Sequence, residues 1–264
     1  SVLNISVDIT DQELAEQALY QKNLQLQQSN TSLEEYAYVA SHDLKEPLRK
    51  IATFSDRILT TQYDTLGTDG KNYLHKIIDS SKRMQAMISD LLSVSTILGN
   101  TAYEPCNLQD ILHEALIPLE YKIEEGKATI EADNLPVISA VPSQFRQLFQ
   151  NLIGNSLKFT RSGIPAHIKI SHKYIGAKAA AAYQLTKANS YLQIQLEDNG
   201  IGFDNEYASK IFAIFQRLHG KSEYEGTGIG LAHCKKIVGL HGGTIWADSK
   251  FGEGSTFHFT IPIL

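Results

Sequence analysis

A histidine and an aspartate stand side by side at His42 and Asp43, inside the stretch YVASHDLKEPLRKI (residues 38–51). A neutral imidazole nitrogen is a competent nucleophile near neutral pH. A neighbouring carboxylate can hydrogen-bond the other ring nitrogen or accept its proton, which orients the ring and raises its basicity. The pair therefore has the groups that nucleophilic transfer at a histidine requires.

Three glycine clusters lie in the second half of the chain: DNGIGFD (198–204), GTGIGLA (226–232) and GEGSTF (252–257). Glycine lets a backbone approach a ligand or another segment closely. GTGIGLA runs directly into an apolar helical pattern, so its amides are expected at a helix N-terminus, where phosphate groups are stabilised. GEGSTF alone also fits an ordinary hairpin turn.

The stretch NLIGNSLKF (residues 151–159) places polar groups at helical spacing. Asn151, Asn155 and Lys158 are separated by four and three residues, so they share one face of a helix. Magnesium is usually held through one or two protein oxygens together with substrate phosphates and water. With a phosphate loop elsewhere, this face predicts a site for a nucleotide with Mg²⁺.

Two rows of residues spaced by seven indicate a coiled-coil seam around His42. If Ala37 and Leu44 occupy a positions and Ala40 a d position, His42 falls at f, which points away from the seam and toward solvent. The seam is expected to comprise Leu19, Leu26, Leu33, Ala40, Pro47 and Phe54 in one row, and Ala37, Leu44, Ile51 and Ile58 in the other.

The seam belongs to the first of two expected helices. The turn-forming stretch TQYDTLGTDGK (residues 61–71) ends the first helix, and a second periodic pattern runs from Lys71 to Leu98, before Gly99 and Asn100. Pro47 cannot donate to the carbonyl of Asp43, so a bend is expected there. One hairpin has too small a core of its own, which predicts an antiparallel helical hairpin that forms a dimeric four-helix bundle.

From about Tyr103 the pattern changes to alternating short strands and helices. Helices are expected near residues 108–124, 143–158 and after Gly226. Strands are expected at ATIEA, HIKIS and YLQIQLE, with a terminal hairpin made by GGTIWADS and STFHFTIPI. This mixture predicts an α+β sandwich in which helices cover one face of a sheet.

Composition narrows the classes of partner. The 264 residues carry a formal net charge of −5, which disfavours nucleic acid as a ligand. The sequence contains neither an apolar run of about 20 residues nor a secretory signal. Its two cysteines, Cys106 and Cys234, are far apart and are expected to be buried thiols.

Six segments occur in an order that resembles sensor histidine kinases of two-component systems: the His42 stretch, NLIGNSLKF, DNGIGFD, IFAIFQRL (211–218), GTGIGLA and GEGSTF. The resemblance extends from about residue 30 to the C-terminus. VDITDQELAEQAL (7–19) is similar to the exit from a PAS sensor domain. The implied domains are the end of a PAS domain and a signalling helix (1–32), a dimerisation and phosphotransfer domain (33–100), and a catalytic ATP-binding domain (101–264).

For the catalytic domain, the resemblance implies the Bergerat-type fold of gyrase and Hsp90, with ATP and Mg²⁺ bound. Asp198 corresponds to the carboxylate that accepts from the adenine amino group, and Gly200 and Gly202 let the backbone pass the base. Asn155 corresponds to the magnesium ligand. The other implied contacts to the nucleotide are Asn151, Lys158 and Phe159.

The resemblance also implies a lid over the nucleotide from about residue 205 to 226, anchored by Phe212 and Phe215, with Arg217 as a phosphate ligand. For both phenylalanines, ordinary core contacts are an equally good interpretation. Thr256 is expected near the adenine. The residues implied to wrap the phosphates are Gly226, Thr227, Gly228, Ile229, Gly230 and Leu231.

The implied function is an ATP-dependent protein-histidine kinase, a homodimer that phosphorylates His42 with the help of Asp43. A separate response regulator would then receive the phosphoryl group on an aspartate. The sensor would lie upstream of Ser1. The segment is expected in the cytoplasm, while the full-length protein can be tethered to a membrane elsewhere. Glu46 stands where many relatives have Thr or Asn, which puts phosphatase activity in doubt.

Two alternatives remain open on the residues alone. An ATPase-driven clamp of the gyrase or Hsp90 kind would share the nucleotide fold without phosphorylating itself, and the His42 stretch argues against it. A scaffold that dimerises without catalysis would not need a complete set of nucleotide residues. The sequence does not distinguish phosphorylation within a subunit from phosphorylation between subunits.

Overall fold

The computed structural model describes residues 10–95, 102–176, 188, 190–218 and 226–263. The start of the stretch 7–19 and the end of the second helix at Leu98 lie outside these residues. The chain divides into two compact units, Ser1–Thr96 and Ile97–Leu264, which are described separately.

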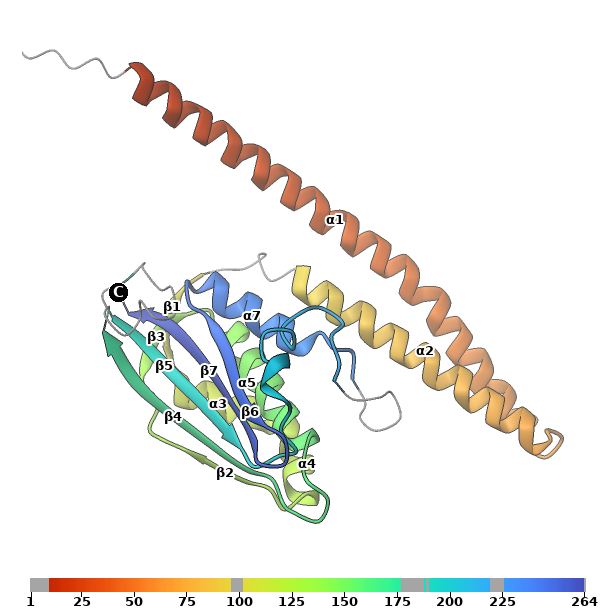
Figure 1. Ribbon diagram of the computed structural model, residues 1–264. Coiled ribbons are helices and arrows are strands. Elements are labelled where there is room, and N and C mark those ends of the chain that lie inside the picture. Colours follow the sequence, from red (N-terminus) through yellow and green to blue (C-terminus); the bar gives the residue numbers. More distant parts are fainter. Residues whose placement is uncertain (1–9, 96–101, 177–187, 189, 219–225, 264) are drawn as a thin grey trace, which may run out of the picture. The chain divides into compact units, whose positions relative to one another are not determined.

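The N-terminal unit is a helical hairpin. Helix α1 (Thr10–Thr61) continues through Pro47, and α2 (Thr68–Ser95) returns alongside it (Figure 1). Near the turn, the Lys71 ammonium lies 3.6 Å from the centre of the Tyr63 ring. The expected hairpin is therefore confirmed, with the first helix starting one residue earlier and the second three residues earlier than the patterns indicated.

The faces that α1 and α2 turn toward each other differ from the predicted seam. Among the hairpin side chains that the structure describes, the buried ones are Ser41, Ser55 and Leu59 on α1, and Ile78 and Ser81 on α2. On α1, the described members of the predicted rows near this contact precede the buried positions by one residue, and their larger side chains stay exposed to solvent. On α2, the predicted pattern includes the buried Ser81 together with the exposed Ile77 and Met84.

We call these exposed residues the open seam: Leu44, Ile51, Phe54 and Ile58 of α1, with Ile77 and Met84 of α2. Each is between 42% and 59% exposed. Several of these residues stand one position before a side chain that is buried in the hairpin: Phe54 precedes Ser55, and Ile77 precedes Ile78. Because the two helices are antiparallel, this one-residue displacement puts both sets on the same side of the hairpin.

The C-terminal unit is built on a five-stranded sheet with the order β2-β4-β5-β7-β6. Strand β2 pairs in parallel with β4, and the other neighbours pair antiparallel. Strands β1 (Glu104–Asn107) and β3 (Val137–Ala140) form a separate two-stranded sheet. The five strands are β2 (Thr129–Ala132), β4 (His167–Gly176), β5 (Ser190–Asp198), β6 (Ile245–Lys250) and β7 (Gly254–Ile263).

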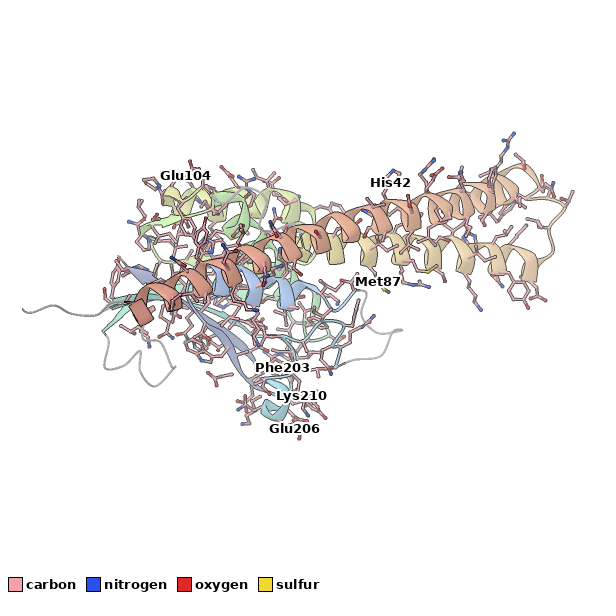
Figure 2. The ribbon with its side chains drawn as sticks, turned by 90° about the horizontal axis from the view of Figure 1, so that it is seen from above. His42, Met87, Glu104, Phe203, Glu206 and Lys210 are labelled. Carbon is pink, nitrogen blue, oxygen red and sulfur yellow. The ribbon has the colours of Figure 1, made fainter. Side chains whose placement is uncertain are left out.

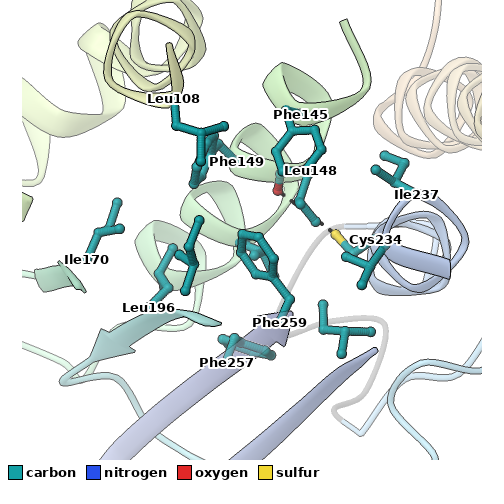
Figure 3. Packing of buried hydrophobic residues seen from close by; sticks show 14 of the residues in the cluster. Leu108, Phe145, Leu148, Phe149, Ile170, Leu196, Cys234, Ile237, Phe257 and Phe259 are labelled. Carbon is teal, nitrogen blue, oxygen red and sulfur yellow. Dashed lines mark hydrogen bonds between the residues drawn. The ribbon is translucent and has the colours of Figure 1, made fainter. Parts of the chain in front are cut away.

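Helices α3 (Leu108–Leu116), α5 (Pro142–Lys158) and α7 (Gly230–Leu240) cover one face of the sheet (Figure 1). Figure 3 shows Phe145, Leu148 and Phe149 of α5 packed over side chains of β5 and β7. Along β7, Phe257 and Phe259 point into this core while His258 points to the opposite face. The α+β sandwich is confirmed, and this alternation decides which strand residues can reach the helices.

One local expectation was wrong, and one strand was not predicted. The single helix predicted for residues 108–124 is divided into α3, a 3₁₀ turn (Ile117–Leu119) and α4 (Glu120–Glu125). Pro118 interrupts it, because proline has no N–H for the helical ladder. Strand β3 was not expected at all, since VISA is short and its partner β1 is distant in sequence.

Both cysteines are buried, as predicted. Cys234 lies under α5, where its thiol donates to the carbonyl of Leu148 at 3.9 Å, and burial raises its pKa to about 12. A thiol that stays protonated near neutral pH packs as a small apolar group.

Among the described residues, none of the helices is long and apolar enough to cross a lipid bilayer.

Candidate functional site

His42 and Asp43 form an exposed pair on α1. Nδ1 of His42 lies 3.3 Å from Oδ1 of Asp43, and the two side chains are 70% and 73% exposed. Figure 2 shows His42 projecting from α1 on the side away from α2. When Nδ1 carries the proton it donates to Asp43, which leaves the lone pair of Nε2 free to attack an electrophile in solvent.

Next to this pair, Glu46 is bound to Lys50 one turn further along α1, with its Oε1 2.7 Å from the ammonium nitrogen. The hydrogen bond from Lys50 holds the pKa of Glu46 below its usual range, and the charge of Lys50 acts in the same direction. Glu46 is therefore a carboxylate committed to an ion pair, and it offers no hydroxyl or amide group to the space beside His42.

Asp198 lies at the end of β5 and is buried on the helix-covered side of the sheet. Its Oδ1 accepts from the backbone N–H groups of Gly200 (2.9 Å) and Ser255 (3.2 Å). Its Oδ2 accepts from the hydroxyl of Ser156 at 3.0 Å. Burial raises the pKa of Asp198, and these three hydrogen bonds oppose that rise.

Neither Ser156 nor Ser255 was predicted from the sequence. Ser156 follows Asn155 directly, but it stands four residues after the buried Leu152, on the face of α5 that packs against the sheet. Ser255 is the cross-strand partner of Asp198. The helical spacing was readable and could have indicated Ser156, whereas the partner of Asp198 depends on strand register.

Thr256 does not lie beside the Asp198 carboxylate. It pairs with Glu197 across β5 and β7, so it shares the side of the sheet opposite Asp198. Side chains on a strand alternate between faces, and a difference of one residue therefore exchanges the two sides. The structure places Ser255, rather than Thr256, beside the buried carboxylate.

Gly200 and Gly202 are required by close contacts within the chain. A Cβ atom on Gly200 would lie 2.4 Å from the carbonyl oxygen of Phe159, and one on Gly202 would lie 2.1 Å from that of Lys250. Gly202 also has a φ of +61°. The glycines of DNGIGFD therefore let this loop lie directly against two neighbouring segments.

The polar face of α5 lies against GTGIGLA. The side-chain amide of Asn151 donates to the carbonyl of Gly230 at 3.3 Å, and a Cβ atom on Gly226 would lie 3.0 Å from the Lys158 ammonium. That ammonium also lies 4.2 Å from the centre of the Phe159 ring. The structure thus brings together Asn151, Lys158 and Phe159 with both ends of the glycine loop.

The side chains gathered here suit Mg²⁺ better than they suit a metal ion whose ligands all come from the protein. Among the described residues, the side chain of Asn155 has no hydrogen-bond partner, and no group of three or more His, Cys, Asp or Glu side chains gathers as for a metal ion. An amide oxygen with no bond of its own suits a hard cation that keeps several waters and is held mainly by phosphates.

Two hydrogen bonds join residues 215–217 to the glycine loop GTGIGLA (residues 226–232). The N–H of Phe215 donates to the carbonyl of Gly228 at 3.0 Å, and Nη1 of Arg217 donates to the carbonyl of Gly226 at 2.8 Å. The chain then enters α7, with Ile229 buried and Thr227 and Leu231 partly buried. Arg217 is thereby held beside the predicted phosphate loop.

The two phenylalanines expected to anchor the lid differ. Phe212 is buried and packs into the main core, in line with an ordinary core contact. Phe215 is 56% exposed and has a φ of +65°, in the left-handed region that is costly for an aromatic residue. The hydrogen bond to the carbonyl of Gly228 fixes its backbone, while its ring does not pack into the main core.

Comparison with known families agrees with this division of the chain. Residues 32–99 match the family described as "His Kinase A (phospho-acceptor) domain". Residues 140–264 match the family described as "Histidine kinase-, DNA gyrase B-, and HSP90-like ATPase". His42 lies within the first match and Asp198 within the second.

Two curated relatives illustrate the similarity. The chain is 39% identical over 239 residues to cyanobacterial phytochrome A of a Nostoc species, covering 90% of this chain and 29% of that protein. It is 32% identical to the adaptive-response sensory kinase SasA of Prochlorococcus marinus, covering 93% of this chain and 63% of that protein. The chain thus spans less than a third of the phytochrome and less than two thirds of SasA.

Solved structures share the fold. Full-length ShkA in complex with AMPPNP superposes with a TM-score of 0.62 at 20% identity, covering 86% of this chain and 45% of that one. The histidine kinase AdeS of Acinetobacter baumannii superposes with a TM-score of 0.53 at 18% identity, covering 82% of this chain and 97% of that one. With both family matches in order along one chain, this chain belongs to the sensor histidine kinases.

Proposed function

We propose that the C-terminal unit binds ATP with Mg²⁺, and that the chain transfers the γ-phosphoryl group to His42 as an ATP-dependent protein-histidine kinase. The observation that carries this proposal is the coexistence of two sites with opposite properties. Asp198 is a buried carboxylate held by three donors, and His42 is an exposed imidazole with a carboxylate at 3.3 Å.

The Asp198 site supports recognition of a purine base. A carboxylate fixed in orientation accepts a hydrogen bond from an exocyclic amino group, and its burial excludes water that would compete for that bond. The solved complex of full-length ShkA with AMPPNP shows that a protein of this fold binds an ATP analogue. Adenine is the base we assign to Asp198 here.

The phosphates are assigned to the face formed by α5 and the glycine loop. Lys158 and Arg217 supply positive charge there, and the amides at the start of α7 supply oriented dipoles. When bound, Mg²⁺ would neutralise charge on the phosphate oxygens, and Asn155 is its ligand in this proposal. Phosphoryl transfer then depends mainly on alignment and on charge neutralisation.

At His42, Asp43 holds the Nδ1 proton and leaves Nε2 unprotonated. Nε2 forms the N–P bond as the P–O bond to the ADP leaving group breaks, and the Nδ1 proton can pass to Asp43 once the ring becomes cationic. The high exposure of this pair is required, because the reacting phosphorus arrives on a separate unit of the chain.

We further propose a homodimer formed through the open seam, which completes a four-helix bundle. The domain limits proposed above, residues 1–32, 33–100 and 101–264, then correspond to a signalling helix after a PAS domain, the bundle and the catalytic unit. An upstream sensor would control the kinase, and a response regulator receiver domain would accept the phosphoryl group from His42 on an aspartate. The ion-paired Glu46 favours weak phosphatase activity toward that regulator.

The test is labelling with ATP that carries a labelled γ-phosphate in the presence of Mg²⁺. A phosphohistidine gives a label that is lost in acid, stable in alkali and absent in His42→Gln. A clamp-type ATPase would release free phosphate without labelling itself, and a scaffold would not bind ATP. A label that survives acid or persists in His42→Gln would contradict the proposal.

A further inference from the structure

Three segments of the C-terminal unit meet beside Asp198. They are residues 159–161 after α5, the loop 198–204 after β5, and the turn 250–254 between β6 and β7. Ile201 lies between the other two: its N–H donates to the carbonyl of Phe159 at 2.9 Å, and its carbonyl accepts from the N–H of Gly252 at 2.7 Å. A row of backbone hydrogen bonds therefore connects the three segments.

The side chain of Arg161 connects the same three segments a second time. Its Nε donates to the carbonyl of Asn199 at 2.8 Å, and its Nη1 donates to the carbonyl of Gly252 at 3.1 Å. Among the described residues, neither carbonyl accepts a further backbone hydrogen bond outside the regular strands. A planar guanidinium presents these two donors at a fixed spacing, which a lysine ammonium cannot do.

The segments that Arg161 joins are the ones that orient Asp198. The two N–H donors to Oδ1 come from Gly200, in the loop, and from Ser255, directly after the turn. The loop and the turn also touch through their backbones, because a Cβ atom on Gly254 would lie 2.0 Å from the carbonyl oxygen of Asp198. A shift of the turn relative to the loop would therefore pull the two donors apart.

We propose that Arg161 is a positioning residue for the nucleotide site: it locks the 250–254 turn to the 198–204 loop and so keeps both N–H donors on Asp198. This inference rests on the proposed function, since it assumes that Asp198 binds the base of ATP. Arg161 acts through backbone carbonyls, so its effect depends on the shape of its fork and not on its charge alone.

The test compares Arg161→Met and Arg161→Lys with Lys250→Met in the full chain. Lys250 stands in the same turn, is ion-paired with Glu253, and has a side chain that is 74% exposed. Its replacement therefore removes one positive charge from the same turn without removing a bridge. For each variant, the KM for ATP and the rate of His42 labelling at saturating ATP are measured with Mg²⁺ present, together with the thermal unfolding midpoint.

We expect the KM for ATP to rise about tenfold in Arg161→Met, as for the loss of one charge-assisted hydrogen bond, while the labelling rate at saturating ATP stays within about twofold. Arg161→Lys keeps the charge and can make only one of the two bonds, so its KM should still rise at least about threefold. Lys250→Met should match wild type. Should Arg161→Met fail to fold, Arg161→Lys alone decides the question.

A KM within about twofold of wild type in Arg161→Met, or full recovery in Arg161→Lys, would overturn the inference, the second result because charge alone would then suffice. An equal rise in Lys250→Met would overturn it for the same reason. These outcomes differ from failure of the proposed function, in which wild-type protein itself neither binds nor uses ATP.

Discussion

The two reactive centres of this chain are held in opposite ways. His42 and Asp43 stand on a regular helix, about 70% exposed, and their mutual distance of 3.3 Å is set by neighbouring positions in sequence. Asp198 is buried, and its three donors come from residues 156, 200 and 255. An exposed nucleophile needs access, whereas a recognition carboxylate needs long-range packing, so mutations should affect the two centres differently.

The largest expected effect concerns assembly of the hairpin. Phe54→Asp places a charge in the open seam, where burial against a second copy would be very costly, so the dimer dissociation constant should rise by more than about a hundredfold. Thr53→Asp, at the neighbouring exposed position, should leave the dimer intact. Sedimentation of the three proteins decides this, and a wild-type monomer at micromolar concentration would contradict the dimer.

The second-largest expected effect concerns the exposed His42–Asp43 pair. Asp43→Asn keeps the size of the side chain but cannot accept the Nδ1 proton, so His42 labelling should slow by about 10²-fold. ATP affinity should not change, because no described residue of the Asp198 site lies in the N-terminal unit. Glu46→Gln serves as the control that removes a nearby carboxylate, and equal slowing in that variant would point to general electrostatics instead.

A smaller effect probes the buried centre. Ser156→Ala removes one of the three donors that orient Asp198, and ATP affinity should fall about three- to tenfold, because a typical hydrogen bond contributes about 1 kcal/mol. The hydrogen bond from Ser156 lowers the pKa of Asp198, so its loss raises that pKa further. Binding in the variant should consequently be lost at a higher pH than in wild type as the solution is acidified.

Thr256→Val is the matched control for that experiment. It changes a hydroxyl one residue away from Ser255 but on the other face of the sheet, so ATP affinity and its pH dependence should stay as in wild type. Calorimetric titration at several pH values compares all three proteins. A loss of affinity in Thr256→Val equal to that in Ser156→Ala would contradict the strand register at this point.

The smallest expected effect is a pH dependence of stability confined to the C-terminal unit. His241 is buried; its Nε2 accepts from the N–H of Val141 at 3.2 Å and its Nδ1 donates to the carbonyl of Ile237 at 2.9 Å. Burial lowers the pKa of His241 below the value of 6.5, so the neutral ring is favoured in the fold. The neutral His241 ring therefore contributes fully to the stability of the fold above pH 6.5, and this stabilisation is lost as the pH falls through the folded-state pKa.

Urea unfolding should therefore show a smaller free energy of unfolding at pH 5.5 than at pH 7.5, and part of that loss should come from this group. The pKa of His258 is also lowered by burial and adds to the loss, so the contribution of His241 is the part that disappears in His241→Asn. Replacement of the exposed His113 by Gln should leave the pH dependence unchanged. An unaltered pH dependence in His241→Asn would contradict the lowering of the pKa of His241 by burial.

The contrast between the centres also explains what the sequence could predict. The two helices of the hairpin, the His42 pair and the polar face of α5 depend on spacing within one element, and the sequence predicted each of them, whereas the single helix predicted for residues 108–124 is divided at Pro118. Ser255 depends on which residue of β7 lies opposite Asp198, and the bridges made by Arg161 depend on loop geometry. The face of α1 that meets α2 was displaced by one residue, because the small serines of the contact have no apolar signature.

The most direct measurement takes ATP binding and His42 labelling on the same samples of wild type, His42→Gln and Asp198→Asn. The account predicts that His42→Gln binds ATP with wild-type affinity and acquires no acid-labile label. It also predicts that Asp198→Asn loses both binding and labelling at ATP concentrations that saturate wild type. Wild-type labelling in either variant, or loss of ATP binding in His42→Gln, would contradict the separation of nucleophile and nucleotide site.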